Sequence, residues 1–400
     1  MTDAKVRWVA TVSAIGLAQI VSWGTLYYAI AVLAAPIQSD TGYSELQVVG
    51  AFSAALALSG IAAPLAGRLI DRYGGRSIMT AGSAIAAIAF FTIGTSTAYA
   101  GFLAGWLIAG VAMSACLYDA AFAMLNRGIP VIHYRSAVTV LTLFGGFAST
   151  LFWPATHLLL QGLGDWRTIC VLYAGAHLGV CLPLHWIAIP RIAYGARAAA
   201  HPDPGGDVRP VARRTMRTLA LAFAANTFVF SIMSVYLIRM LDARGLDATH
   251  AIVLASLIGP FQVAARVLEF TLSGRISAIA AGTASFAMLS ASLGVFLLID
   301  GPGAAAIAFI GLYGASNGVM TIARGTVPAE LFGREGYGAT LGRLALPSLI
   351  AKALAPGAFA LLLASGLGFN DGMRLLAGTA VLGWLAYAVA TGVRASPRSS

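Results

Sequence analysis

Long apolar runs of about twenty residues recur along the chain, and short polar segments separate them. A membrane hydrocarbon core about 30 Å thick takes roughly 20 apolar helical residues to cross. With 59% hydrophobic and 10% charged residues among 400, the chain is too apolar for a soluble domain. Backbone groups inside lipid must pair within their own element, so we predict an all-α membrane protein.

The apolar runs form two groups of six, and a segment rich in Arg, Pro and Gly lies between them. We therefore predict an N-terminal half at 1–189, a cytoplasmic linker at 190–217 and a C-terminal half at 218–400. A further cytoplasmic loop is expected at 325–337. The twelve expected transmembrane helices cover about residues 8–34, 46–66, 77–94, 100–125, 136–161, 168–189, 218–241, 249–273, 276–299, 302–323, 338–364 and 372–393.

The arginines predict which side of the membrane each loop occupies. The segments 68–76, 127–135 and 191–217 fall on one side and carry many of them. By the positive-inside rule this side is the cytoplasm, and both termini lie there. The net charge of +10 is spread over these loops and forms no patch for nucleic acid. Four arginines fall on the opposite side: Arg167, Arg239, Arg244 and Arg374.

The segment 67–76 between the second and third apolar runs combines three arginines, one carboxylate and three glycines. We expect Gly67 to let the end of one helix press against a neighbour, and Gly74 and Gly75 to supply turn freedom. Asp71 is placed to accept hydrogen bonds from an arginine or from a helix N-terminus.

This order of residues resembles the signature loop between helices 2 and 3 of the major facilitator superfamily. Gly75 departs from the pattern, because a second basic residue is usual there. The resemblance implies two six-helix halves around a midplane site in a bacterial inner membrane. It also implies a cytoplasmic latch in which Asp71 pairs with Arg127 at the end of helix 4. The residues of this predicted gating latch are Gly67, Asp71, Arg72, Gly74, Arg76 and Arg127.

The two halves repeat in short stretches of sequence. Residues 125–128 are expected to end helix 4 as residues 322–325 end helix 10, each with an Arg-Gly pair. The corresponding segment of the second half matches the latch pattern poorly, because only Gly274 and Arg275 remain.

Charged residues inside a membrane span are expensive and indicate functional sites. Lys352 is one of only two lysines and lies near the middle of its span. We predict that Arg266 and Lys352 form a cationic clamp for the substrate. The alternative pairs Arg266 with Glu269 one helical turn away and gives Lys352 a structural role. Asp119, the fourth charge within a span, either carries a proton or faces a helix dipole.

Basic residues on helices 8 and 11 are similar to those of the oxalate–formate exchanger, and the helix 8 arginine resembles that of monocarboxylate transporters. The stretch 23–28, Trp-Gly-Thr-Leu-Tyr-Tyr, also looks like bacterial members of that branch. Gln262 departs from it, since an aspartate usually stands four residues before the arginine. Glu269 is a substitute for that aspartate. Glu269 and Asp119 are our proton-coupling candidates.

Helical spacing adds further substrate-binding candidates. Gln19, Trp23 and Tyr27 recur every four residues and share one helix face, as do Tyr313 and Asn317. Asn226 lies in the middle of the seventh span. Each of them is equally suited to an ordinary hydrogen bond between helices.

We predict a secondary transporter that moves a small organic anion, a carboxylate, by alternating access. The alternative is an exporter of drug-like or neutral metabolites, with Trp23, Tyr27 and Tyr28 as an aromatic pocket. Helix 5 lacks the full glycine–proline pattern of drug/proton antiporters, which weakens that alternative.

A membrane enzyme or sensor is disfavoured, since the sequence shows no metal cluster, nucleophile–base pair or phosphate loop. We expect no cofactor, no bound metal, no nucleic-acid partner and a monomer in the bilayer. Direction and coupling, to a proton or to a counter-anion, stay open.

Overall fold

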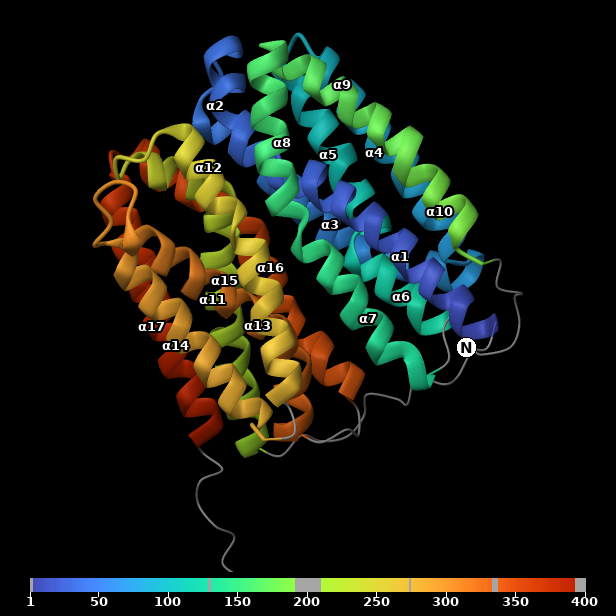
Figure 1. Cartoon of the computed structure of the whole chain (residues 1–400), viewed down its shortest axis with the longest axis vertical. Helices are drawn as coiled ribbons and strands as arrows, with labels where there is room; N and C mark the ends of the chain where they lie inside the picture. Colours follow the sequence, from blue (N-terminus) through green and yellow to red (C-terminus); the bar gives the residue numbers. More distant parts are fainter. Residues whose placement is uncertain (1–2, 129–130, 191–209, 273–274, 333–336, 393–400) are drawn as a thin grey trace, which may run out of the picture. The chain divides into compact units, whose positions relative to one another are not determined.

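The computed structural model describes residues 3–128, 131–190, 210–272, 275–332 and 337–392. Within them, 12 helical stretches are long and apolar enough to cross a membrane, as an all-α membrane protein requires. The chain divides into two compact units, residues 1–198 and 199–400, and each contains six of these stretches (Figure 1). Side chains are described at 8–125, 137–190, 213–269, 271–272, 275–332 and 343–392.

The first unit begins with α1 and ends with α10. Its helices start and stop on conventional signals: Ser44 and Gln47 form a capping box before α3, and Asp165 caps α9. Its elements are α1 (Asp3–Trp23), η1 (Gly24–Tyr28), α2 (Ile30–Thr41), α3 (Glu45–Tyr73), α4 (Gly75–Thr95), α5 (Tyr99–Cys116), α6 (Tyr118–Gly128), α7 (Val131–Gly146), α8 (Ala148–Leu163), α9 (Trp166–Ala176), η2 (His177–Cys181) and α10 (Leu182–Ala188).

The second unit pairs α14 with α15 and α11 with α16, and α13 packs along α15. Its elements are α11 (Pro210–Asp242), α12 (Ala248–Ser256), α13 (Ile258–Leu272), α14 (Ala278–Phe296), α15 (Ala304–Phe332), α16 (Tyr337–Ala364) and α17 (Phe369–Gly392).

Five of the twelve expected helices are interrupted. Helices 1 and 6 each contain a five-residue π-helical segment, η1 and η2, a feature that often marks functional sites. Helix 4 breaks at Leu117, helix 5 at Phe147 and helix 8 at Leu257. Apolar periodicity continues through each interruption, so the sequence pattern does not predict them.

Three segments predicted as loops or linker are helical instead. The latch segment belongs to α3 and α4, and Gly74 alone separates them, with φ at +85°. Residues 325–332 continue α15, and residues 210–217 open α11. Buried Ile70, Val327 and Leu331 explain the first two, because they extend an inward face past the charges.

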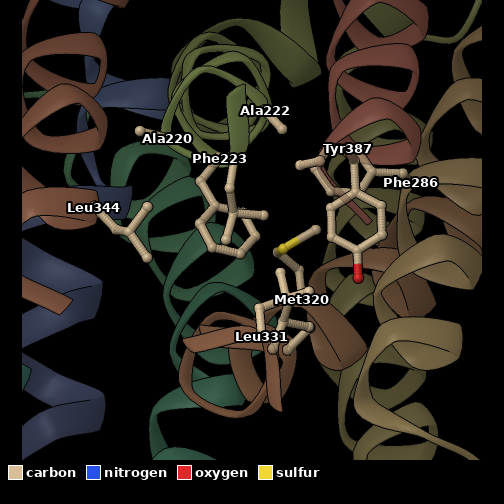
Figure 2. Packing of buried hydrophobic residues seen from close by; sticks show 12 residues of the cluster. Ala220, Ala222, Phe223, Phe286, Met320, Leu331, Leu344 and Tyr387 are labelled. Carbon is tan, nitrogen blue, oxygen red and sulfur yellow. The ribbon is translucent and has the colours of Figure 1, made fainter. Parts of the chain in front are cut away.

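The core of the second unit is a cluster from α11, α14, α15, α16 and α17 (Figure 2). The Tyr387 ring lies 4.8 Å from that of Phe286, and its hydroxyl donates to the Ile279 carbonyl at 3.0 Å. A Cβ at Gly282 would lie 2.2 Å from this hydroxyl oxygen, so only glycine fits here. Small residues thus let α14 and α17 approach closely.

Outward-facing side chains are apolar in both units. Ile61, Ile187 and Leu298 are each more than 70% exposed. Such side chains are costly in water and favourable against lipid tails, in keeping with a protein that crosses a membrane.

Candidate functional site

An aromatic cluster surrounds Trp23 in the first unit. Its ring centre lies 5.2 Å from Tyr27, 6.4 Å from Tyr28 and 5.0 Å from Tyr118. Tyr28 continues the cluster to Trp153 at 5.5 Å. The predicted grouping of Trp23 and Tyr27 on one helix face therefore exists, and rings from α6 and α8 enlarge it.

Gln19 ties this cluster to the break in helix 4. The Cys116 carbonyl at the end of α5 accepts from Gln19 Nε2 at 2.6 Å, where Leu117 takes an extended conformation. A helix that breaks leaves carbonyls without helical partners, and this amide supplies one. Gln19 Oε1 accepts from Trp23 Nε1 at 3.1 Å, so the same side chain orients the indole.

Asp119 follows that break, in the first turn of α6. The side chain is exposed. The positive end of a helix dipole favours a negative charge in this turn. The position fits the dipole alternative directly, and the proton-carrying role stays a prediction.

The two π-helical segments meet through one hydrogen bond. Thr25 Oγ1 lies 2.9 Å from His177 Nε2 and also donates to the Val21 carbonyl at 2.8 Å. Because a hydroxyl has one proton, His177 Nε2 is the donor to Thr25. The first unit thus joins its two irregular segments inside its core, where His177 is fully buried.

Gly67 and Gly75 of the latch segment lie in different surroundings. Among the described residues, a Cβ at Gly67 would meet nothing within 4 Å, so the expected close helix contact at Gly67 is not seen there. Gly75, in contrast, is buried, and a Cβ there would lie 2.1 Å from Met124 Cγ. The departure of Gly75 from the family pattern has this steric reason.

The arginines of the latch segment rest on aromatic rings. Arg72 lies over Tyr73 at 5.2 Å, and Arg76 lies over Trp186 of α10 at 4.3 Å. Asp71 is exposed near the end of α3. The side chain of Arg127 lies outside the described side chains, so the Asp71–Arg127 pair stays a prediction.

In the second unit Arg266 projects from α13 and is only 4% exposed. One of its terminal nitrogens, Nη2, donates to Thr321 Oγ1 of α15 at 3.0 Å. Thr321 in turn donates to the Asn317 carbonyl at 2.9 Å, so it is oriented to accept. Glu269 is half-buried on the same helix, one turn away.

Lys352 lies half-buried on α16, and its backbone carbonyl accepts from Ser231 Oγ of α11 at 2.8 Å. Pro356 stands four residues later and has no N–H to offer that carbonyl. Ser231 therefore replaces the missing helical hydrogen bond and fixes Lys352 against α11.

Arg324 was expected at the end of helix 10 and instead lies inside α15. Its Nη2 donates to Asn226 Oδ1 at 3.0 Å and to Thr227 Oγ1 at 2.7 Å, both on α11. Asn226 is 1% exposed, so this predicted candidate is buried against an arginine that was not among the predicted site residues.

A polar and aromatic stripe runs along α15. Tyr313, Asn317, Thr321 and Arg324 recur at spacings of four, four and three, and so share one helix face. Tyr313 is buried, with its ring 4.7 Å from Phe230 of α11. This spacing is the signal that could have identified Arg324, since it extends the Tyr313–Asn317 pair by two turns.

A charged junction lies outside the spans of the first unit. Asp40 near the end of α2 accepts from Arg167, and from Trp166 Nε1 at 3.0 Å. The hydrogen bonds from Arg167 and Trp166 hold the pKa of the Asp40 carboxyl below its usual value. Arg167 also lies over the Trp166 ring at 4.3 Å.

Within the described residues, no group of three or more His, Cys, Asp or Glu side chains could hold a metal ion. The three cysteines are buried and free. The polar groups that the structure brings together, guanidinium, amide and hydroxyl, are suited to binding and carry no evident catalytic nucleophile.

The part of the chain that the structure describes has twelve apolar helices in two compact units, the architecture of a polytopic membrane protein. The sequence profile of the Major Facilitator Superfamily matches residues 15–356, and the chain belongs to this family. The match to this family indicates a transporter and not an enzyme.

Curated relatives and solved structures agree on this class. The chain is 27% identical over 227 residues to the multidrug resistance protein MdtL of Klebsiella pneumoniae strain 342, covering 55% of this chain and 56% of that protein. It thus spans little more than half the length of that relative.

Two solved structures share the fold at low identity. A bacterial homologue of the lysosomal transporter Spinster aligns with a TM-score of 0.71 at 16% identity, over 98% of both chains. The nucleoside transporter NupG aligns with a TM-score of 0.72 at 13% identity, over 96% of this chain and 100% of that one. The expected oxalate–formate branch is not among these relatives.

Proposed function

We propose that the transporter moves a small organic anion and that Arg266 binds its acidic group. One observation carries this proposal: a guanidinium that is 4% exposed inside a membrane span, held by the neutral hydroxyl of Thr321. That hydroxyl orients the guanidinium. An arginine can offer a carboxylate two parallel hydrogen bonds, which a lysine cannot.

Lys352 is the second cation of this proposal. Ser231 fixes its backbone to α11, and its side chain is half-buried. An ammonium on a flexible stem supplies a point charge that adapts to anions of different shape. The resemblance of Arg266 and Lys352 to the oxalate–formate exchanger supports the same substrate class. Glu269 and Asp119 are the proposed proton carriers if transport is proton-coupled.

Counterflow in proteoliposomes tests this proposal. Purified protein is reconstituted, loaded with one unlabelled carboxylate at a time and assayed for uptake of the labelled compound. We expect exchange of at least one carboxylate, its loss in Arg266→Ala and in Arg266→Lys, and its retention in Arg374→Ala as the matched control. Arg374 is exposed and pairs with Asp371 at 2.9 Å, outside the proposed site. Exchange that Arg266→Ala leaves unchanged contradicts the proposal.

A drug-like substrate is the second candidate function. The aromatic cluster around Trp23, with Tyr27, Tyr28 and Tyr118, is suited to flat apolar compounds. The similarity to MdtL, a multidrug resistance protein, points the same way. Export of a fluorescent aromatic cation by cells, lost in Trp23→Ala and retained in Arg266→Ala, would favour this function over anion transport.

We propose further that Asp71 and Arg127 form a cytoplasmic latch, with both termini in the cytoplasm of a bacterial inner membrane. The arginine-rich loops support this orientation. Asp71→Asn then slows turnover and leaves substrate affinity unchanged, because latch and binding site are separate. Cleavage of segment 190–217 by a protease from the periplasmic side would contradict the orientation.

A further inference from the structure

Helices α4 and α10 of the first unit pack against each other and have polar side chains at their contact (Figure 1). Arg76, Thr80 and Ser83 of α4 recur at spacings of four and three, so they share one helix face. Arg76 lies over the Trp186 ring at 4.3 Å. Ser83 Oγ lies 2.8 Å from His185 Nδ1. This polar face of α4 is therefore turned towards α10, and we call the contact the α4–α10 seam.

Three buried polar atoms of the seam have no hydrogen-bond partner among the described residues: Arg76 Nε, Thr80 Oγ1 and His185 Nε2. Thr92 and Thr95, on the same helix, each donate to the carbonyl four residues before them. Thr80 makes no such bond within the part of the chain that the structure describes. Buried polar atoms without partners are costly, so their concentration here indicates a ligand.

The protons on these groups determine what such a ligand must offer. The Ser83 hydroxyl donates its one proton to the Met79 carbonyl at 3.2 Å, so His185 Nδ1 is the donor to Ser83. His185 Nε2 is then an acceptor on a fully buried side chain. Arg76 Nε is a donor, and the Thr80 hydroxyl is both. A ligand with an anionic acceptor and with hydroxyl groups therefore complements the seam.

Arg76 differs from an arginine of the same unit that is stacked in the same way. Arg167 lies over the Trp166 ring at 4.3 Å, and Asp40 accepts from it. Arg76 lies over its tryptophan at the same distance, but its Nε has no acceptor among the described residues. It stands in the first turn of α4, which has no acidic side chain, so the positive end of the helix dipole adds to the attraction for an anion.

The seam lies at the ends of two membrane spans and borders the lipid-facing surface. The spans are Gly75–Thr95 and Trp166–Ala188, so Arg76 and Trp186 each stand within three residues of an end. Trp186 is 46% exposed and Ile187 is 77% exposed. Tryptophan and arginine at the end of a span are typical of the headgroup level of a bilayer. A lipid can therefore reach Arg76 from the side.

We propose that the α4–α10 seam binds an anionic phospholipid whose headgroup carries hydroxyl groups, as in phosphatidylglycerol. The phosphate accepts from Arg76, which can offer an oxyanion more than one N–H. The headgroup hydroxyls bond to Thr80 and donate to His185. The acyl chains lie along the apolar surface that includes Ile187, which a free phosphate could not use. This inference goes beyond the proposed function and does not depend on the charge of the substrate.

Lipid binding to the purified full chain tests the seam, with phosphatidylglycerol and phosphatidylcholine of identical acyl chains as probes. Delipidated protein in detergent is titrated with each, and native mass spectrometry and thermal unfolding measure the affinity of the first lipid bound. We expect phosphatidylglycerol to bind more tightly. Arg76→Gln should lower that preference about fivefold, as expected for one basic residue at the membrane surface. The matched control Arg167→Gln, another arginine stacked on a tryptophan, should retain it.

Thr80→Val provides a second variant that keeps the shape of the side chain. It removes no hydrogen bond to a described residue, so the melting temperature in phosphatidylcholine should not fall. The preference for phosphatidylglycerol should fall at least about twofold, because a headgroup hydrogen bond is lost. If Arg76→Gln does not fold, this variant decides.

Two results would overturn the proposal. The first is an unchanged preference for phosphatidylglycerol in Thr80→Val and in any folded Arg76→Gln protein. The second is stabilisation by glycerol 3-phosphate or inorganic phosphate that equals that by the lipid, since the seam would then bind a soluble anion. Neither result bears on carboxylate exchange, so the proposed function stands or falls separately.

Discussion

The two units share a six-helix plan and differ in what they place among those helices. In the first unit aromatic rings surround Trp23, and Gln19 donates to the Cys116 carbonyl at the break in helix 4. The second unit gathers guanidinium, amide and hydroxyl groups along α15. A ring favours apolar and flat groups, whereas a buried arginine favours anions.

The repeated Arg-Gly pair occupies different positions in the helices of the two units. In the first unit Arg127 lies near the end of α6, and the latch segment supplies Asp71 as its predicted partner. In the second unit the corresponding segment retains only Gly274 and Arg275 and offers no aspartate. Arg324 instead lies within α15 and bonds to Asn226.

The largest effect on anion binding is expected for substitution of Arg266, a buried arginine of the second unit. Losing a desolvated charge contact costs about 2–5 kcal/mol, so Arg266→Ala should weaken anion binding roughly 30-fold or more. Arg266→Lys should be nearly as damaging, because lysine cannot form the paired hydrogen bonds. Titration of the reconstituted protein with the exchanged carboxylate measures both. An Arg266→Lys protein with unchanged affinity would show that the second unit needs only a charge.

The next effect concerns the stability of the first unit, where one glycine is closely packed and another is not. Gly75→Ala places a Cβ 2.1 Å from Met124 Cγ and should destabilise the protein by about 1–3 kcal/mol. Gly67→Ala is the matched control, since no atom of the described part of the chain lies within 4 Å of a Cβ there. That change should stabilise helix α3 by roughly 0.5–1 kcal/mol. Thermal unfolding in detergent compares them, and equal melting temperatures would argue against the Gly75 contact.

A smaller effect tests how the second unit fixes Lys352. Ser231→Ala leaves the Lys352 carbonyl without a donor and should cost about 1 kcal/mol. Pro356→Ala restores an N–H four residues after Lys352, so the double variant should lose less than the sum of the two single changes. Additive melting shifts would mean that Ser231 and Pro356 do not act on the same carbonyl.

The smallest effect concerns the charged ends of the units. In the first unit Asp40 joins α2 to α9 through Arg167, whereas Asp371 and Arg374 pair within α17. The folded pKa of Asp40 is depressed, so its contribution to stability is present above the unfolded value near 3.8 and is lost as pH falls through the lower folded pKa. Melting temperatures of Asp40→Asn and Asp371→Asn should differ slightly at pH 7 and converge below pH 4.

The fold followed from the sequence because membrane thickness sets the length of each apolar run. The position of Arg324 inside a helix could not be predicted, because an Arg-Gly pair in both halves suggested a helix end. Buried Val327 and Leu331 instead extend α15 beyond it. The π-helical segments and the break at Leu117 depend on partners distant in sequence, Thr25 with His177 and Gln19 with Cys116. Hydrophobic periodicity carries no information about such partners.

The central claim is that the second unit binds an anionic group. A series of ligands that match in shape and differ in charge tests this claim directly. Valerate, valeramide and pentylammonium have similar size and carry a negative, neutral and positive head group. Stabilisation of the purified protein by valerate, lost in Arg266→Ala, and none by the other two is the result expected. Stabilisation by pentylammonium or valeramide that equals or exceeds that by valerate would contradict an anion site.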